Sequence, residues 1–288
     1  MGVRKGIKWF LYSGWPLFGV RQLRRRLAGA PTAVYFYPED PRANLFGYAI
    51  KLFLHRGGVR YARRPAHGIW TMRWEDQTEG RWDERLQALS KECAIINARC
   101  LDISKNHVEE VFVRVFGYSS LVDPTSFVGD CVEKSDANGK ADGRMITCPI
   151  EAPNEACVYQ IRIDTTVDDE LVDELRIPIF GQSIPFIMTK YKRIDAPFSY
   201  SVKGTLDEVA DCLSEEEEAL ILRFCAEIGL DCGELDVLRD RPSGKLYIVD
   251  ANNTPSIHFA GYSKAEEKEI ISRMARAFDA AFGDWRLG

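Results

Sequence analysis

One stretch near the end of the sequence, residues 233–255, constrains the fold of this chain more than any other. It reads GELDVLRDRPSGKLYIVDANNTP, with an apolar run on each side of a Pro-Ser-Gly turn, and therefore predicts a β-hairpin. A five-residue loop at 241–245 fixes the register of the two strands, in which Leu238 lies opposite Ile248.

The same register places Asp236 opposite Asp250 and indicates a bound cation. Two like charges directly opposite each other destabilise an antiparallel pair, so this arrangement needs a compensating positive charge. Asn252 shares a face with Asp250, because strand side chains alternate with a period of two. Two carboxylates and an amide oxygen suit Mg²⁺ better than zinc or copper. The alternative is a surface hairpin in which Asp236 is exposed and residues 252–255 only break the strand.

Length and composition favour an ordinary globular protein. The 288 residues are enough for about two domains or one large α/β unit. Hydrophobic residues at 45% and charged residues at 28% exclude a disordered or membrane-embedded chain. A formal net charge of -5 argues against a nucleic-acid partner. The eight cysteines form no C-x-x-C pair and the four histidines no H-E-x-x-H motif, so we expect reduced thiols in a cytoplasmic protein.

Strand-like and helix-like segments alternate from residue 31 onward and predict an α/β fold. The extended segments among the first hundred residues are 33–37, 68–74 and 94–97. An apolar helical run at 45–54 is ended by Gly57 and Gly58. The part at 127–163 is β-rich and contains a Ser, Asp, Asn and Gly loop at 135–143.

Three helices are marked by their ends. Ser104 and Gly117 bound a predicted helix at 104–116. Capping boxes begin two further amphipathic helices, and these boxes are Ser214 with Glu217 and Ser263 with Glu266. Gly229 is expected to end the first of these two helices.

The first thirty residues differ from the rest, because they are basic and aromatic and no acidic residue precedes Glu39. Their apolar run is interrupted by Pro16 and is shorter than the roughly 20 residues needed to span a bilayer, and it lacks the features of a signal peptide. Two interpretations remain: contact with an anionic lipid surface, or an N-terminal helix that covers the core and exposes a basic face.

Residues 97–255 resemble the ATP-grasp superfamily, most specifically in the Asp-bearing strand and the Asp-x-Asn return of the hairpin. Relatives include D-alanine:D-alanine ligase, glutathione synthetase and the ribosomal-protein glutamate ligases. The resemblance implies that Asp236, Asp250 and Asn252 hold Mg²⁺, or Mn²⁺, against the phosphates of ATP. The second acid is usually Glu in this superfamily, so Asp250 is one methylene shorter than expected.

The resemblance also implies a nucleotide site. Lys105 and Lys134 would face the phosphates, under a mobile flap formed by the loop that follows Lys134. The segment 159–163 resembles the hinge between the lobes whose backbone reads adenine, and its nucleotide-binding residues would be Gln160, Ile161 and Arg162. One of Asp164, Asp168 or Asp169 would bind the ribose.

The implied chemistry is carboxylate activation. Arg176, in the acid-x-Arg strand that begins at Glu174, would face the transferring phosphoryl group together with Lys134, and these two are the candidate catalytic residues. Lys190 and Arg193 would either bind a small acidic substrate or be solvated surface charges. The carboxylate of this substrate would attack the γ-phosphate of ATP to give an acyl phosphate, which an amine, or less often a thiol, then displaces. The alternatives are a kinase that phosphorylates a sugar or polyol hydroxyl, and a non-catalytic nucleotide-binding module.

The resemblance thus implies an ATP-grasp fold, in which the nucleotide lies between two lobes and an α/β substrate domain precedes them. We predict three ranges along the chain. They are 1–96 for the N-terminal α/β domain with its basic aromatic leader, 97–165 for the small lobe with the phosphate flap, and 166–288 for the C-terminal lobe with the Mg²⁺ site. The sequence leaves the substrates and the oligomeric state open.

Overall fold

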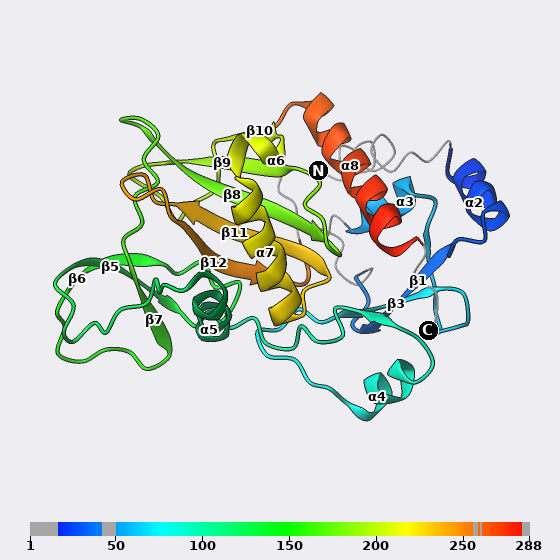
Figure 1. Cartoon of the computed structure of the whole chain (residues 1–288), viewed down its shortest axis with the longest axis horizontal. Coiled ribbons are helices and arrows are strands. Elements are labelled where there is room, and N and C mark those ends of the chain that lie inside the picture. The colour runs from blue at the N-terminus through cyan, green and yellow to red at the C-terminus, as the bar shows by residue number, and fades with distance from the viewer. Residues whose placement is uncertain (1–16, 42–49, 256–258, 260, 284–288) are drawn as a thin grey trace, which may run out of the picture.

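The computed structural model describes residues 17–41, 50–255, 259 and 261–283. Within them the chain forms three β-sheets with helices packed around them. The three sheets lie in a row in Figure 1. The basic aromatic run at 1–16 and the first half of the predicted helix at 45–54 lie outside the described residues. No helix in the described part combines the length and the apolar character needed to cross a bilayer.

The first sheet is parallel and four-stranded. Its strands, in spatial order, are β2 (Arg60–Tyr61), β1 (Ala33–Pro38), β3 (Trp70–Trp74) and β4 (Ile95–Ile96). The accompanying helices are α2 (Phe18–Leu27), α3 (Ile50–Arg56) and α4 (Glu84–Ser90). Three of the strands match the predicted extended segments, and β2 was not predicted. Trp70, Arg73 and Trp74 are fully buried in β3 and belong to the core.

A small antiparallel sheet follows, at the opposite end of the molecule in Figure 1. Its strands, in spatial order, are β6 (Arg144–Cys148), β5 (Gly129–Ser135) and β7 (Cys157–Ile161). This confirms the β-rich character predicted for 127–163. The loop between β5 and β6 corresponds to the predicted flap, and Lys134 lies near the end of β5.

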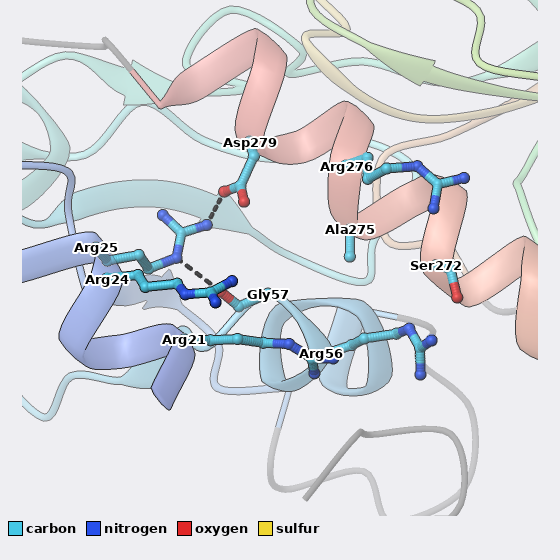
Figure 2. A pocket seen from close by; sticks show the side chains of 9 residues that line it. All are labelled: Arg21, Arg24, Arg25, Arg56, Gly57, Ser272, Ala275, Arg276 and Asp279. Carbon is cyan, nitrogen blue, oxygen red and sulfur yellow. Dashed lines mark hydrogen bonds and ion pairs between the residues drawn. The ribbon is translucent and has the colours of Figure 1, made fainter. Parts of the chain in front are cut away.

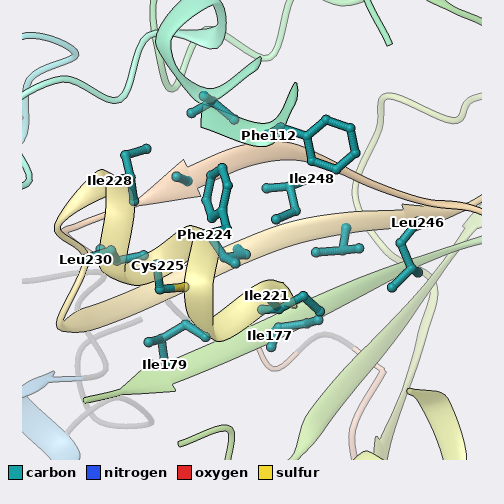
Figure 3. Packing of buried hydrophobic residues seen from close by; sticks show 14 of the residues in the cluster. Phe112, Ile177, Ile179, Ile221, Phe224, Cys225, Ile228, Leu230, Leu246 and Ile248 are labelled. Atoms are coloured by element: carbon teal, nitrogen blue, oxygen red, sulfur yellow. The ribbon is translucent and has the colours of Figure 1, made fainter. Parts of the chain in front are cut away.

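The central sheet is five-stranded and antiparallel. Its strands, in spatial order, are β10 (Lys203–Asp207), β9 (Ile187–Arg193), β8 (Leu171–Phe180), β11 (Cys232–Arg239) and β12 (Leu246–Asn252). Helices α5 (Lys105–Phe116) and α7 (Glu215–Ile228) cover one face with apolar side chains such as Phe112 and Phe224, which share a core with Ile248 of β12 (Figure 3). The other face therefore carries the polar side chains of β8, β9, β11 and β12.

Two further helices complete the described chain, and they are the short α6 (Val209–Cys212) and the long α8 (Lys264–Phe282). The predicted helix ends are confirmed. Ser104 accepts a hydrogen bond from the backbone of α5, and both capping boxes are formed. Gly117 and Gly229 adopt the left-handed conformation that ends α5 and α7.

The hairpin of β11 and β12 is formed, with one correction to its register. Asp236 lies opposite Asp250 as predicted, but Leu238 pairs with Tyr247 and not with Ile248. A bulge between Asp236 and Val237 shifts the pairing beyond the two acids, because Val249 is an extra residue on β12. The prediction of a five-residue loop from the turn residues assumed a regular register and therefore did not include an extra residue on β12.

Each predicted range contains one of the three sheets, but two helices pack outside their own range. Helix α5, from the middle range, packs on the central sheet. Helix α8, from the end of the chain, shares a core with β1, β3 and α3 through residues such as Ile271 and Phe278. The division at 96 and 165 remains a prediction of the sequence.

Candidate active site

A cavity of about 1000 Å³ opens on the polar face of the central sheet and extends under the small sheet. The predicted nucleotide, metal and catalytic residues line it, and they are Lys105, Lys134, Gln160, Ile161, Arg162, Asp164, Arg176, Asp236, Asp250 and Asn252. They come from segments more than a hundred residues apart, so the fold brings the residues of the predicted site to one place.

Asp236 pairs with cations of strands β8 and β9. Arg176 lies directly opposite it on β8, with its Nε 3.0 Å from Oδ1 of Asp236. The Nζ of Lys190 on β9 lies 3.6 Å from the same oxygen. Burial raises the pKa of the Asp236 carboxyl, and Arg176 offsets part of this rise. The compensating positive charge that the facing acids require is therefore supplied, on this side, by protein side chains.

Asp250 is less well compensated. Its Oδ1 is buried and has no hydrogen-bond partner among the described residues. Burial, followed by the facing Asp236, raises its pKa to about 6, so the carboxyl is mostly ionised at neutral pH. An unsatisfied carboxylate oxygen beside a second carboxylate fits a divalent cation with oxygen ligands. In the described chain no group of three or more His, Cys, Asp and Glu is arranged for a metal.

Glu234 was not predicted as part of this network. It is fully buried on β11, two residues before Asp236 and on the same face, and its Oε2 lies 3.5 Å from Nη1 of Arg176. Burial lowers the pKa of Arg176, but Asp236 and Glu234 raise it by a larger amount. The guanidinium therefore stays charged. The strand period of two is the signal that could have identified Glu234.

Two lysines reach the cavity from its other side. The Nζ of Lys134 donates to the carbonyl of Val249 at 3.2 Å, at the bulge of β12. Burial lowers the pKa of Lys134 to about 8, against the influence of the nearby Asp250. The Nζ of Lys105 donates to the carbonyl of Ala137 at 2.9 Å and so ties the β5–β6 loop to the start of α5. Both ammonium groups are held by backbone carbonyls that phosphate oxygens could replace.

The end of β7 and the segment that follows it form one wall of the cavity. Gln160 is buried, and its side chain donates to the Ser120 hydroxyl at 2.9 Å. Among the three aspartates considered for the ribose, only Asp164 lines the cavity. Asp168 instead accepts backbone hydrogen bonds in the turn that precedes β8. Asp169 lies outside the cavity lining as well.

The candidates for substrate binding divide in the same way. Lys190 and Lys192 line the cavity and flank Glu174, with Nζ to carboxylate distances of 3.3 and 2.7 Å. Although burial raises the pKa of Glu174, the two lysines hold it below its usual range. Arg193 is exposed, pairs with Asp195 and does not line the cavity. Lys192 was not predicted, although it follows Lys190 on the same face of β9.

The loop between β9 and β10 also contributes residues that the sequence did not reveal. Its residues 194–202 carry exposed apolar side chains, among them Phe198 and Tyr200, and most of the loop lines the cavity. A Cβ on Gly143 would lie 2.9 Å from the ring of Phe198, so the β5–β6 loop and this loop meet closely. No local pattern marked this loop, because its role depends on the contact with the small sheet.

Comparison with solved structures identifies the fold. One similar structure is the ATP-grasp ligase PsnB, complexed with a phosphomimetic variant of a minimal precursor, Mg and ADP. Its TM-score is 0.55 at 15% identity, over 88% of this chain and 99% of that chain. Another is D-alanine–D-alanine ligase from Bacillus anthracis complexed with ATP, with a TM-score of 0.52 at 11% identity, over 88% of this chain and 96% of that one.

No protein-family model matches the chain, and no curated protein matches its sequence. The structural likeness extends over nearly the whole of both neighbours. The chain therefore has the ATP-grasp fold, which confirms the fold class expected from the hairpin.

Proposed function

We propose that this protein is an ATP-dependent ligase, which binds Mg²⁺-ATP and activates a carboxylate as an acyl phosphate for attack by an amine or a thiol. The observation that carries the proposal is the facing pair Asp236 and Asp250, with the unsatisfied Oδ1 of Asp250 in a cavity lined by Arg176, Lys105 and Lys134. A cluster of negative charges surrounded by positive charges is unfavourable in a cavity that holds no ligand. It suits a ligand that brings both a metal ion and phosphates.

Two solved structures of the same fold support the choice of ligand. PsnB is complexed with Mg and ADP, and the Bacillus anthracis ligase with ATP. By this proposal, Asp236, Asp250 and Asn252 of the present chain hold Mg²⁺, with Mn²⁺ as a substitute. When bound there, the ion neutralises phosphate charge and fixes the nucleotide for in-line attack. The ATP supply of the cytoplasm makes it the expected compartment.

The side chains around the cavity supply the rest of the catalysis. Lys134 and Lys105 neutralise the phosphates, and Arg176, which lines the same cavity, faces the transferring group while Asp236 and Glu234 keep it charged. A substrate carboxylate oxygen forms the new bond to the γ-phosphorus as the bond to the bridging oxygen breaks and ADP leaves. The acceptor amine then attacks the acyl carbon and phosphate departs. Lys190 and Lys192 are placed to bind the acidic substrate.

Thermal unfolding tests the nucleotide and metal site. Mg²⁺-ATP at about 100 times its dissociation constant should stabilise the wild type by roughly 2.7 kcal/mol, and ATP with EDTA should stabilise it less. Asp250→Asn should unfold at a higher temperature than wild type without ligand, because it removes a buried, poorly paired charge. Its response should no longer depend on the metal. Asp211→Asn, an exposed change on α6, is the control and should behave as wild type. An equal metal-dependent shift in Asp250→Asn would contradict the assignment.

Product analysis then separates the ligase from a kinase. Free carboxylates and peptides with acidic side chains are incubated with Mg²⁺-ATP and hydroxylamine, which traps an acyl phosphate as a hydroxamate. A hydroxamate together with ADP supports the ligase. A stable phosphate ester on a sugar or polyol hydroxyl would instead establish the kinase, and nucleotide binding without turnover of any compound would leave a binding module.

A further inference from the structure

A second cavity of about 350 Å³ lies at the other end of the molecule, between helices α2, α3 and α8. Five arginines from these three helices line it (Figure 2), and they are Arg21, Arg24, Arg25, Arg56 and Arg276. Gly57, Ser272, Ala275 and Asp279 complete the lining. It shares no lining residue with the candidate active site.

One of these arginines has a structural role. Arg25 is buried, and its Nε donates to the carbonyl of Gly57 at 2.7 Å and its Nη1 to that of Pro31 at 3.1 Å. It also pairs with Asp279 and lies over the ring of Trp70, 5.3 Å from the centroid. Arg25 thus fixes α2 against the first sheet, and it uses the single carboxylate that lines the cavity.

The lining carries five arginines and one carboxylate, so its formal charge is positive. Arg276 pairs with Glu269 at 2.9 Å on the rim. The Nη1 of Arg21 is buried and has no hydrogen-bond partner among the described residues. A buried guanidinium nitrogen without a partner is costly, so a ligand that accepts its hydrogen bond would stabilise the arrangement.

The arginines also repel one another. Burial lowers the pKa of Arg56, and the charges of Arg21 and Arg276 lower it further, while Glu269 opposes them. A general preference for basic residues in the last turn of a helix accounts for Arg56 on α3 and for Arg24 on α2. It does not account for Arg21 or Arg276, which lie outside the last turns of α2 and α8.

The backbone brings α2 this close. Gly58 has a φ of 78°, and a Cβ at this position would lie 2.7 Å from Cβ of Arg21. The Gly57-Gly58 pair therefore ends α3 and at the same time lets Arg21 approach Arg56. The close approach of α2 to the end of α3 is therefore set by the backbone.

We propose that this arginine cavity binds the phosphate group of an anionic ligand. Guanidinium groups match phosphate oxygens with paired hydrogen bonds, and arginine stays charged where lysine would lose its proton. The volume of about 350 Å³ is large enough for a phosphate that is attached to a further group. The chemistry fits either a soluble phosphate compound or the headgroup of a phospholipid.

An apolar stripe on α2 makes the headgroup of a phospholipid one of the two sources to test. Val20, Leu23 and Leu27 follow a helical spacing on the outward side of α2, and they are 50%, 57% and 80% exposed. An apolar stripe beside a cationic cavity is the arrangement of a helix that lies in a lipid interface. The experiment therefore has one arm for each source.

The soluble arm uses pyrophosphate and isothermal titration calorimetry. Because pyrophosphate also suits the candidate active site, the comparison is between wild type and the double variant Arg21→Gln/Arg56→Gln, in which that site is unchanged. The variant should lose one class of binding site, or bind it at least tenfold more weakly. Arg223→Gln, an exposed arginine on α7, is the control and should match wild type. A thermal midpoint no lower than that of the wild type shows that the variants are folded.

The lipid arm uses flotation with phosphatidylcholine vesicles, with and without phosphatidylglycerol. Binding to the anionic vesicles that is lost in Arg21→Gln/Arg56→Gln and in Leu23→Ser/Leu27→Ser identifies a headgroup. Pyrophosphate binding without vesicle binding identifies a soluble ligand. The proposal is overturned if the arginine substitutions weaken neither pyrophosphate binding nor vesicle binding. Vesicle binding that persists in the double arginine variant, with pyrophosphate binding unchanged, is one such result.

Discussion

Single side chains at the candidate active site are held in a network of opposed charges. Glu234 and Asp236 share Arg176, while Asp250 and Lys134 are both shifted toward their neutral forms by burial. Such a network is expensive to leave partly satisfied, because buried charges without partners cost more than the pairs recover. A ligand with both metal and phosphate would satisfy the two sides together.

Arg176→Gln should destabilise the protein by about 3–5 kcal/mol, because it leaves two buried carboxylates without their main partner. Adding Asp236→Asn should restore part of the loss, since it removes one of these charges. Arg193→Gln, which breaks an exposed pair with Asp195, should cost much less. Urea unfolding measures all three variants. Similar losses in Arg176→Gln and Arg193→Gln would show that the buried network contributes little.

The affinity for ADP should fall as the pH rises through the pKa of Lys134. The phosphates bind the protonated ammonium of Lys134 and so raise its pKa. The affinity for ADP is therefore highest well below pH 8, where Lys134 is protonated, and falls as the pH rises above 8. From pH 7 to pH 9 the dissociation constant should rise about tenfold. Lys134→Arg keeps its charge over this range and should flatten the profile in calorimetric titrations. A steep profile in the variant would assign the titration to another group.

At the level of helices and strands, the sequence was informative wherever structure is determined locally. The capping boxes at Ser214 and Ser263 and the left-handed glycines depend on neighbours within one turn, and each was confirmed. The facing of Asp236 and Asp250 followed from alternation along two adjacent strands. The bulge at Val249 did not, because it depends on packing against the other strands and leaves no mark in the turn residues.

Long-range contacts were outside the reach of these local patterns. Nothing in the sequence of α8 shows that it packs against β1 and β3, about two hundred residues away or more. The 194–202 loop was missed for the same reason. The roles of the cavity residues rest on the resemblance and remain predictions, whereas their convergence on one cavity is a result of the fold.

Two helix-ending glycines offer a test of local against long-range effects. Gly117 and Gly229 have nearly the same φ, 80° and 79°, but only Gly229 packs against other backbone, because a Cβ at this position would lie 2.7 Å from the carbonyl carbon of Arg99. Gly117→Ala should cost about 1 kcal/mol for the left-handed conformation. Gly229→Ala should cost about 1–3 kcal/mol more, because the chain must shift. Equal midpoints in urea unfolding would mean that the contact at Arg99 is easily relieved.

At the scale of the described molecule, the cavity of the candidate active site is bordered by segments that belong to different sheets. The β5–β6 loop rests on α5 through Lys105 and, on the side of the first sheet, on Thr78, whose Oγ1 accepts a hydrogen bond from the backbone of Asn138 at 2.8 Å. It meets the 194–202 loop at Gly143. Phosphates that compete for Lys105 would release its bond to Ala137, so nucleotide binding and the position of this loop should be linked.

Trypsin provides a measure of this link. Lys140 is exposed at the tip of the β5–β6 loop, and Lys245 is exposed in the β11–β12 loop outside the cavity. If the loop closes over the nucleotide, Mg²⁺-ADP should slow cleavage after Lys140 severalfold and leave cleavage after Lys245 unchanged, because only the first loop becomes ordered. Mass spectrometry of the early fragments separates the two sites, and Lys140→Gln confirms the assignment. Faster cleavage after Lys140 with nucleotide would show that displacing Lys105 opens the loop, and equal slowing at both sites would reflect global stabilisation alone.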